Sequence, residues 1–265
     1  MNARAVRVDI SGAVCTITLN RPDRLNAMNE QMCTELHEST GMLAEDPAIR
    51  VVVIAGEGRS FSAGADLRDG GVILPDDWAG RRRAAGRWQR LLDRLEALPQ
   101  ATVAVLHGHV VGGAVLLAAA CDLRIAAQDV AIAVPEVAIG LPLTWGGIPR
   151  LVREIGLSRT RDLVMTGRTV GGEEALAWGL VHRLVPPGQL GDAADSLVTD
   201  LVAMPEVPLA LTCASLRALG RDLLTASWAD ADLLAWTLRE PGTATAAQAY
   251  TQRHLGGPRT PPRQT

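Results

Sequence analysis

Residues 107–122 have the sequence HGHVVGGAVLLAAACD, and this stretch decides the expected fold class. The preceding residues 102–106 (TVAVL) are short, apolar and rich in β-branched side chains, which is typical of a buried strand. Residues 107–113 then form a glycine-rich turn. Residues 114–120 predict an almost wholly apolar helix that should be buried on all sides. A strand, a glycine turn and a buried helix in this order favour an α/β unit.

The same order occurs earlier in the chain. Residues 50–55 (RVVVIA) predict a buried strand, and a loop rich in glycine and serine follows at 56–66. We also expect helices at 29–44, capped by Asn29, and at 77–98, ended by Pro99. Further strands are predicted at residues 4–10, 13–19, 123–126 and 130–134. The repetition indicates stacked β/β/α units.

No strand is predicted after Pro187. Four helices are expected instead, at residues 189–203, 206–220, 227–239 and 243–254. We therefore divide the chain into a core at 1–190 and an all-helical region at 191–265. The last ten residues hold three prolines and are expected to fray.

Composition indicates an ordered globular protein. Of the 265 residues, 48% are hydrophobic and 21% are charged, and the net charge of −3 argues against a nucleic-acid partner. The 26 residues counted as lysine plus arginine are all arginine, which excludes Schiff-base chemistry on a lysine. The longest apolar run, residues 110–121, is well short of the ~20 residues that a membrane helix needs.

Cysteine usage suggests a reducing compartment. The four cysteines are scattered without metal-ligand spacing, at Cys15, Cys33, Cys121 and Cys213. We expect buried thiols and a cytoplasmic location. His107 and His109 could share a face of a strand, but no third ligand is evident, so we predict no metal site.

Three segments contain the candidate chemistry. The first is the loop 58–67 (GRSFSAGADL), whose small residues would let a ligand approach backbone amides, although it could be an ordinary connection between elements. The second is Gly112-Gly113 at the start of the apolar helix, which could offer free N–H groups to an anion or could serve close packing alone.

The third segment is 134–151 (VPEVAIGLPLTWGGIPRL), where Glu136 is a lone carboxylate in apolar surroundings. Desolvation there would raise its pKa toward the range of a general base. A structural carboxylate, paired or capping a turn, is the alternative. In the same segment, Thr144 and Trp145 could shape a pocket or belong to the core.

Together these segments resemble the crotonase superfamily, also called the enoyl-CoA hydratase/isomerase family. The resemblance starts with NRPDRLNAMN (residues 20–29) and SFSAGADL (60–67). It continues through the glycine turn and apolar helix (107–122) and the segment that contains Pro135-Glu136 (134–151) to TGRTVGGEEALAWGLVHRLVP (166–186). It implies a crotonase-like spiral of ββα units, an acyl-CoA substrate, no resident cofactor, and a homotrimer or dimer of trimers formed through the helical region.

The resemblance also implies roles for individual residues. The main-chain N–H groups of Ala65 and Gly113 would form an oxyanion hole for the thioester oxygen, and Glu136 would be the proton-transfer group. Arg24 would meet the CoA phosphates. Other positions that the resemblance places at the substrate are Leu25, Ala63, Gly64, Asp66, Leu67, Gly112 and Leu116.

One position departs from the hydratase pattern. Hydratases of this family use two glutamates, and the first falls on Leu116, which cannot transfer a proton. A single base can still move a proton between two carbons, which favours double-bond isomerisation of an enoyl-CoA. Slow hydration, with His109 as a substitute proton carrier, remains an alternative, as do decarboxylation, hydrolysis and acyl-CoA binding without catalysis.

Overall fold

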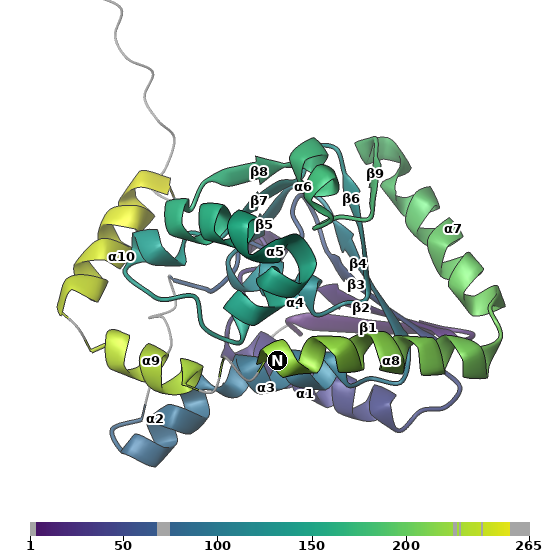
Figure 1. Ribbon diagram of the computed structural model, residues 1–265, viewed down its shortest axis with the longest axis horizontal. Coiled ribbons are helices and arrows are strands. Elements are labelled where there is room, and N and C mark those ends of the chain that lie inside the picture. Colours follow the sequence, from purple (N-terminus) through teal and green to yellow (C-terminus); the bar gives the residue numbers. More distant parts are fainter. Residues whose placement is uncertain (1–3, 68–74, 225–226, 228, 240, 255–265) are drawn as a thin grey trace, which may run out of the picture.

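The computed structural model describes residues 4–67, 75–224, 227, 229–239 and 241–254. The proline-rich last ten residues, which were expected to fray, lie outside the described residues. Figure 1 shows a central sheet with helices on both sides and the C-terminal helices α9 and α10 at the opposite end of the molecule from α7.

The larger sheet is mostly parallel. Its six strands lie in the order β1 (Val6–Ser11), β2 (Val14–Leu19), β3 (Val51–Gly56), β4 (Ala101–Leu106), β6 (Leu123–Ala127) and β9 (Arg183–Val185). Only the β1–β2 pair, a hairpin around the turn at Gly12, is antiparallel. The parallel pairs need the crossover connections that the helices supply.

A second, smaller sheet lies beside the first and has three short strands. Their order is β5 (His109–Val111), β7 (Ala131–Ala133) and β8 (Thr169–Gly171). The N-terminal helices and the helices of the core are α1 (Glu30–Ala44), α2 (Trp78–Ala85), α3 (Arg87–Glu96), α4 (Gly113–Ala119), α5 (Gly147–Thr166) and α6 (Gly172–Trp178). Three short 3-10 helices are η1 (Pro22–Arg24), η2 (Glu136–Ile139) and η3 (Pro187–Gln189).

The two faces of the larger sheet pack against different layers, because alternate side chains of a strand point to opposite faces. Val51 and Val53 of β3 belong to a cluster with Leu197 and Val198 of α7 (Leu190–Ala203). Val52 and Ile54 belong to the main core with helices α1, α3 and α4. Every residue of α4 is buried, as its apolar sequence predicts.

The C-terminal region is helical, as predicted. After α7 come α8 (Glu206–Leu224), α9 (Asp230–Thr237) and α10 (Pro241–His254), and the part of this region that the structure describes has no strand. No single described helix is long and apolar enough to cross a membrane. The bent pair Pro187–Ala203 and Glu206–Gly220, which turns by 109°, meets the length and composition criteria together.

The observed elements differ from the prediction at three kinds of place. The helices α5 and α6 were not predicted. The helix expected at 77–98 is two helices, because Gly86 leaves helical geometry between α2 and α3. The strands β5, β8 and β9 were not predicted as strands. Each has three residues, too few for an alternating pattern to show in the sequence. The Asn29 cap is confirmed, since its side chain accepts a hydrogen bond from Met32 N–H.

Candidate active site

One cavity of about 830 Å³ brings together residues from all three candidate segments. The loop after β3 contributes Ala65, Asp66 and Leu67, and α4 contributes Gly113 and Leu116. Glu136 lines the same cavity from η2. Segments that are far apart in the sequence therefore form a single site.

The loop that carries Ala65 is held by main-chain hydrogen bonds on both sides. Met28 N–H donates to Gly64 O at 2.7 Å, and Asp66 N–H donates to Met28 O at 3.1 Å. Gly64 has a φ of +79°, and a Cβ built on it would lie 2.3 Å from Val111 O and 3.7 Å from Gly112 Cα. Only glycine allows this approach. As a result, the residue that precedes Ala65 packs closely against the carbonyl of Val111, two residues before Gly113.

The two glycines at the start of α4 have different neighbours. Gly112 has a φ of +56° and donates its N–H to Ala133 O at 2.8 Å, which joins this turn to β7. Gly113 is the first residue of the helix, where an N–H has no partner within the helix. A Cβ at Gly113 would lie 2.2 Å from Cζ3 of Trp145, so this position also requires glycine.

Two main-chain donors are available in this cavity. Neither the N–H of Ala65 nor that of Gly113 has a hydrogen-bond acceptor among the residues that the structure describes. Both residues line the cavity wall. Main-chain donors fixed in this way can bind an oxygen on which negative charge develops.

Glu136 supplies the only strongly perturbed acid of this cavity among the described residues. Its Oε2 is buried and has no hydrogen-bond partner, although the residue as a whole is partly exposed. Burial raises the pKa of the Glu136 carboxyl from an ordinary 4.5 to about 7, and its own backbone N–H opposes the shift. An acid with this pKa can take up and return a proton near neutral pH.

The other carboxylates at this cavity are paired. Asp66 is 8% exposed, and its Oδ2 accepts a hydrogen bond from Arg21 Nη1 at 2.7 Å. Glu30, at the start of α1, pairs with Arg87. Glu136 is thus the carboxylate whose charge is not compensated.

Most of the remaining wall is apolar. Leu116 is 1% exposed and lies near Gly147, since a Cβ at that glycine would be 2.9 Å from Leu116 Cδ1. Trp145 lines the cavity together with Trp88, and their rings stack with centroids 5.2 Å apart. Side chains of α9 and α10 complete the wall with Leu234, Leu238, Thr243, Ala247, Gln248, Thr251 and Gln252.

Sequence reasoning missed several lining residues. Trp88 and the side chains of α9 and α10 belong to no motif, and their place depends on how distant helices pack. Thr144 and Trp145 were named as possible pocket residues, and both line the cavity.

Other predicted substrate positions lie outside the cavity lining. Arg24 is exposed at the end of η1, and Leu25, with a φ of +50°, accepts a hydrogen bond from Ala63 N–H through its carbonyl at 2.8 Å. Ala63, Gly64 and Gly112 do not line the cavity either. The role predicted for Arg24 stays a prediction.

The histidines of the glycine turn do not join the site. His109 is exposed and does not line the cavity, so an assisting role in proton transfer has no structural support. His107 Nε2 lies 2.9 Å from Gly58 O. Within the described residues, no group of three or more potential protein ligands could hold a metal ion.

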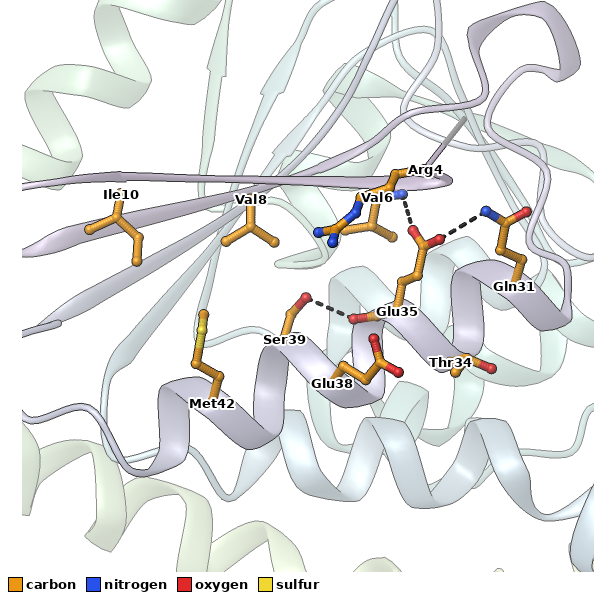
Figure 2. Close-up of a pocket in the computed structure, with 10 residues that line it drawn as sticks. All are labelled: Arg4, Val6, Val8, Ile10, Gln31, Thr34, Glu35, Glu38, Ser39 and Met42. Atoms are coloured by element: carbon orange, nitrogen blue, oxygen red, sulfur yellow. Dashed lines mark hydrogen bonds between the residues drawn. The ribbon is translucent and has the colours of Figure 1, made fainter. Parts of the chain in front are cut away.

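A second groove of about 720 Å³ runs between β1 and α1 (Figure 2). Of its two acids, Glu35 is already engaged, because it accepts hydrogen bonds from Val6 N–H at 2.7 Å and from Gln31 Nε2 at 2.8 Å, and Glu38 is exposed to solvent. The open strand edge and an apolar floor formed by Val8, Ile10 and Met42 offer no group for chemistry. The candidate active site is the cavity at Glu136.

Two main-chain donors and one unpaired acid define a site that can polarise a carbonyl and move a proton beside it. Comparison with known proteins points to the same class. The sequence profile described as enoyl-CoA hydratase/isomerase matches residues 9–254. The chain belongs to the enoyl-CoA hydratase/isomerase family, and its fold is the crotonase fold.

Individual relatives agree with this assignment. A probable enoyl-CoA hydratase of Mycobacterium bovis is 36% identical over 204 residues, which cover 75% of this chain and 72% of the relative. A short-chain-enoyl-CoA hydratase of Clostridium acetobutylicum is 30% identical, covering 80% of each chain. The crystal structure of an enoyl-CoA hydratase from Mycobacterium avium subsp. paratuberculosis superposes with a TM-score of 0.85 at 28% identity. That superposition covers 94% of this chain and 96% of the other.

Proposed function

We propose that this enzyme isomerises the double bond of an enoyl-CoA thioester, with Glu136 as the single proton-transfer group. The observation behind the proposal is the pairing state of the acids at the cavity: Glu136 is unpaired and has a raised pKa, and Leu116 stands where a second acid would be needed for hydration. The proposed reaction needs no metal or redox group, because no electrons are exchanged with the enzyme.

The proposed mechanism follows from these groups. The thioester oxygen accepts hydrogen bonds from the N–H groups of Ala65 and Gly113. Ionised Glu136 removes a proton from C2 of a 3-enoyl thioester, and the electron pair delocalises onto the oxygen as a dienolate. The protonated Glu136 then returns the proton to C4, which leaves a 2-enoyl thioester. Loss of one such donor typically costs ~2.7–4 kcal/mol of transition-state stabilisation.

Hydration of a 2-enoyl-CoA is the second candidate. The names of the relatives favour it, since the two cited above are named as enoyl-CoA hydratases. Hydration adds water across the double bond, and this normally uses one group to activate the water and one to protonate the neighbouring carbon. Leu116 cannot be that second group.

A direct assay separates the two reactions. Purified protein is incubated with a 3-enoyl-CoA and, separately, with a 2-enoyl-CoA. Isomerisation gives a product of unchanged mass with new absorbance of the conjugated thioester, whereas hydration adds the mass of water and removes that absorbance. Faster turnover of the 2-enoyl substrate to a hydrated product would reject the isomerase proposal. Binding of thioesters without turnover would favour a carrier.

We further propose that the chain assembles as a homotrimer or as a dimer of trimers. The support is an exposed apolar surface on α8, where Val207, Leu211, Leu216 and Leu219 are each more than 60% exposed. Large apolar side chains gathered on one helix are typical of a contact with another chain. The occupant of this surface would be a second copy of the same protein.

A further inference from the structure

Trp145 has a backbone conformation that a bulky residue rarely adopts. Its φ is +60°, and among the described residues only Leu25 and Asn26 are other non-glycine residues with positive φ. Such a conformation is unfavourable by itself and persists only where the surroundings enforce it. Its location beside a candidate active site therefore suggests a functional reason.

Two buried charged groups hold Trp145 in place. Arg150, which is fully buried, donates from Nη1 to Trp145 O at 2.7 Å. Asp230 accepts a hydrogen bond from the next amide, Gly146 N–H, at 2.7 Å. The carbonyl of Trp145 and the N–H that follows it are both engaged, which fixes the orientation of the peptide.

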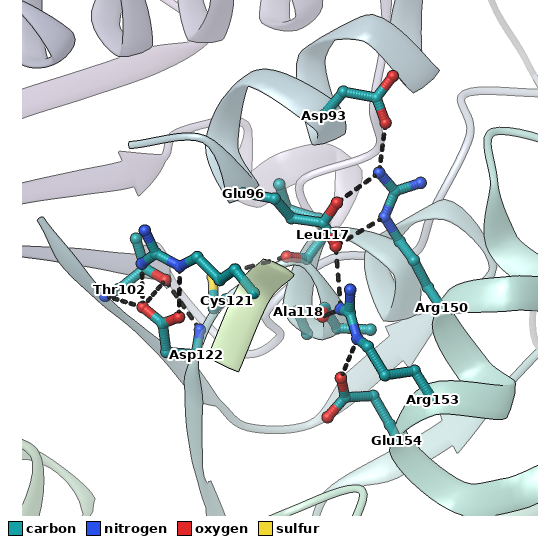
Figure 3. Close-up of polar contacts among 12 residues, drawn as sticks. Asp93, Glu96, Thr102, Leu117, Ala118, Cys121, Asp122, Arg150, Arg153 and Glu154 are labelled. Atoms are coloured by element: carbon teal, nitrogen blue, oxygen red, sulfur yellow. Dashed lines mark hydrogen bonds and ion pairs between the residues drawn. The ribbon is translucent and has the colours of Figure 1, made fainter. Parts of the chain in front are cut away.

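The same arginine joins this loop to the helix that carries Trp88. Arg150 Nη2 lies 2.6 Å from Asp93 Oδ1 and 2.9 Å from Glu96 Oε2, and both acids belong to α3 (Figure 3). Trp88, on α3, stacks on Trp145 with an angle of 18° between the rings. The ion pairs of Arg150 and the stacking of Trp88 on Trp145 thus both join α3 to the segment that contains Trp145 and Arg150.

The ring of Trp145 approaches the predicted oxyanion donor with its edge. A Cβ built on Gly113 would lie 2.2 Å from Cζ3 and 3.1 Å from both Cε3 and Cη2. If the built Cβ lay above the ring face, its distances to Cε3 and Cη2 would be shorter than 3.1 Å. The Cβ position of Gly113 therefore lies near the plane of the ring, outside its edge. The indole edge occupies the place that a side chain at 113 would take.

At the neighbouring Gly112, the carboxylate of Glu136 occupies the place that a side chain would take. A Cβ at Gly112 would lie 2.6 Å from Glu136 Oε1. The carbon next to a thioester carbonyl bound at Gly113 N–H lies within roughly 5 Å of that nitrogen, by ordinary hydrogen-bond and covalent lengths. Since Glu136 and Trp145 both line the cavity beside Gly113, the space between the carboxylate and the indole is a slot within reach of that carbon.

We propose that Trp145 is the specificity-determining residue of this slot, and that the enzyme prefers 3-enoyl groups that carry an aryl ring at C4 and no branch at C2 over alkyl or C2-branched ones. This inference rests on the proposed function, because it assumes that the thioester oxygen binds at Gly113. An aryl group can meet the indole edge in the edge-to-face arrangement that aromatic pairs favour, whereas a methyl branch at C2 collides with either the ring or the acid.

The test measures thioester binding without turnover. In the Glu136→Gln background, calorimetry gives Kd for three ligands: a 4-aryl-3-enoyl-CoA, a straight-chain 3-enoyl-CoA with the same number of acyl carbons, and the 2-methyl form of the latter. With Trp145 present, we expect the aryl ester to bind roughly 2- to 12-fold more tightly than the alkyl ester. The 2-methyl ester should bind most weakly.

Variants separate the contributions of stacking and shape. Trp145→Phe should keep the aryl preference and admit the 2-methyl ester, while Trp145→Leu should lose the preference. Trp78→Leu is the matched control, since Trp78 is 55% exposed on α2 and does not line the cavity. Near-ultraviolet circular dichroism and the unfolding midpoint identify folded variants. If Trp145→Leu does not fold, two measurements still test the inference. Binding of the 2-methyl ester to Trp145→Phe tests the steric exclusion, and the three ligands on the protein with Trp145 test the preference for the aryl ester.

Equal binding of aryl and alkyl esters by the Trp145 protein would overturn the inference, as would a Trp145→Phe protein that still excludes the 2-methyl ester. These outcomes differ from failure of the proposed function. In that case no thioester would bind at all, or isomerisation would survive Glu136→Gln.

Discussion

Oε1 of Glu136 lies so close to Gly112 that a Cβ built on this glycine would be 2.6 Å away from it. The next residue, Gly113, presents one of the two free amide groups of the cavity. The acid therefore lies beside the residue that precedes the donor, so a base and a polarising group are close together in one cavity.

Glu136→Gln should abolish isomerisation while leaving the binding of CoA thioesters within a few-fold of the wild-type protein. The amide cannot take a proton, whereas its shape is nearly unchanged. In the wild-type protein the base must be ionised, so kcat/KM should rise with pH and level off above about 7, the raised pKa of this carboxyl. Steady-state rates between pH 5 and 9 check this. A rate that does not depend on pH in that range, or an active Gln variant, would contradict the assignment.

The same carboxyl should make stability depend on pH. Its pKa is about 7 in the folded protein and 4.5 ordinarily, so the folded state binds more protons between these values. Its stabilising contribution is full below pH 4.5 and is lost as the pH rises through 7. At 1.36 kcal/mol per pKa unit, the loss is about 3 kcal/mol.

Glu136→Gln removes this dependence. Urea unfolding at pH 5 and pH 8 should show the Gln variant gaining stability relative to the wild-type protein at the higher pH. A constant difference between the two proteins would mean that the carboxyl is not desolvated.

Gly64→Ala should reduce kcat/KM by roughly 10²- to 10³-fold, the effect of losing one oxyanion donor. Its new Cβ would lie 2.3 Å from Val111 O, so the loop that carries Ala65 must shift. Gly156→Ala is the matched control. Gly156 has a similar φ of +76° but nothing within 4 Å of the built Cβ, so that variant should lose about 1–3 kcal/mol of stability through backbone strain and keep its rate. Equal rates in the two variants would argue against the donor.

Leu116→Glu should raise the ratio of hydration to isomerisation, because it places a second acid in the same cavity. The new carboxyl would be buried near Gly147 and Leu143, and we expect a loss of about 2–5 kcal/mol in stability. Mass analysis of the products gives the ratio. Leu116→Gln serves as the control, since it has similar bulk and no titratable proton. A gain of hydration by both variants would show that acidity is not the cause.

Leu219→Glu should dissociate the proposed trimer. Leu219 is 79% exposed on α8, and a carboxylate buried between two copies would lack a partner. Light scattering after size-exclusion chromatography gives the mass of the particle. Ile10→Glu, a substitution of a 54% exposed residue on the edge strand β1, should leave that mass unchanged. A wild-type protein that runs as a monomer would refute the assembly directly.

The parts of the fold that could be predicted from sequence are those with strong local signals. The β-branched runs at β3 and β4, the apolar helix α4 and the Asn29 cap depend on neighbouring residues alone, and each is confirmed. The three-residue strands β5, β8 and β9 depend on pairing with distant segments. No local pattern marks them, and they were missed.

The site shows the same division. The glycine turn, the loop 58–67 and Glu136 were identified because glycine and a lone acid are unusual in apolar stretches. All three meet in one cavity. Trp88 could not be found in this way. Its place depends on the ion pairs of Arg150 with Asp93 and Glu96, which lie 57 and 54 positions before that arginine in the sequence.

The two polarising groups predicted for this cavity are peptide amides, and this affects how the family can diversify. Side chains around the cleft can be exchanged over generations while the amides, which every residue except proline possesses, remain available. Substrate preference is thus free to change under selection without rebuilding the part that activates the ester.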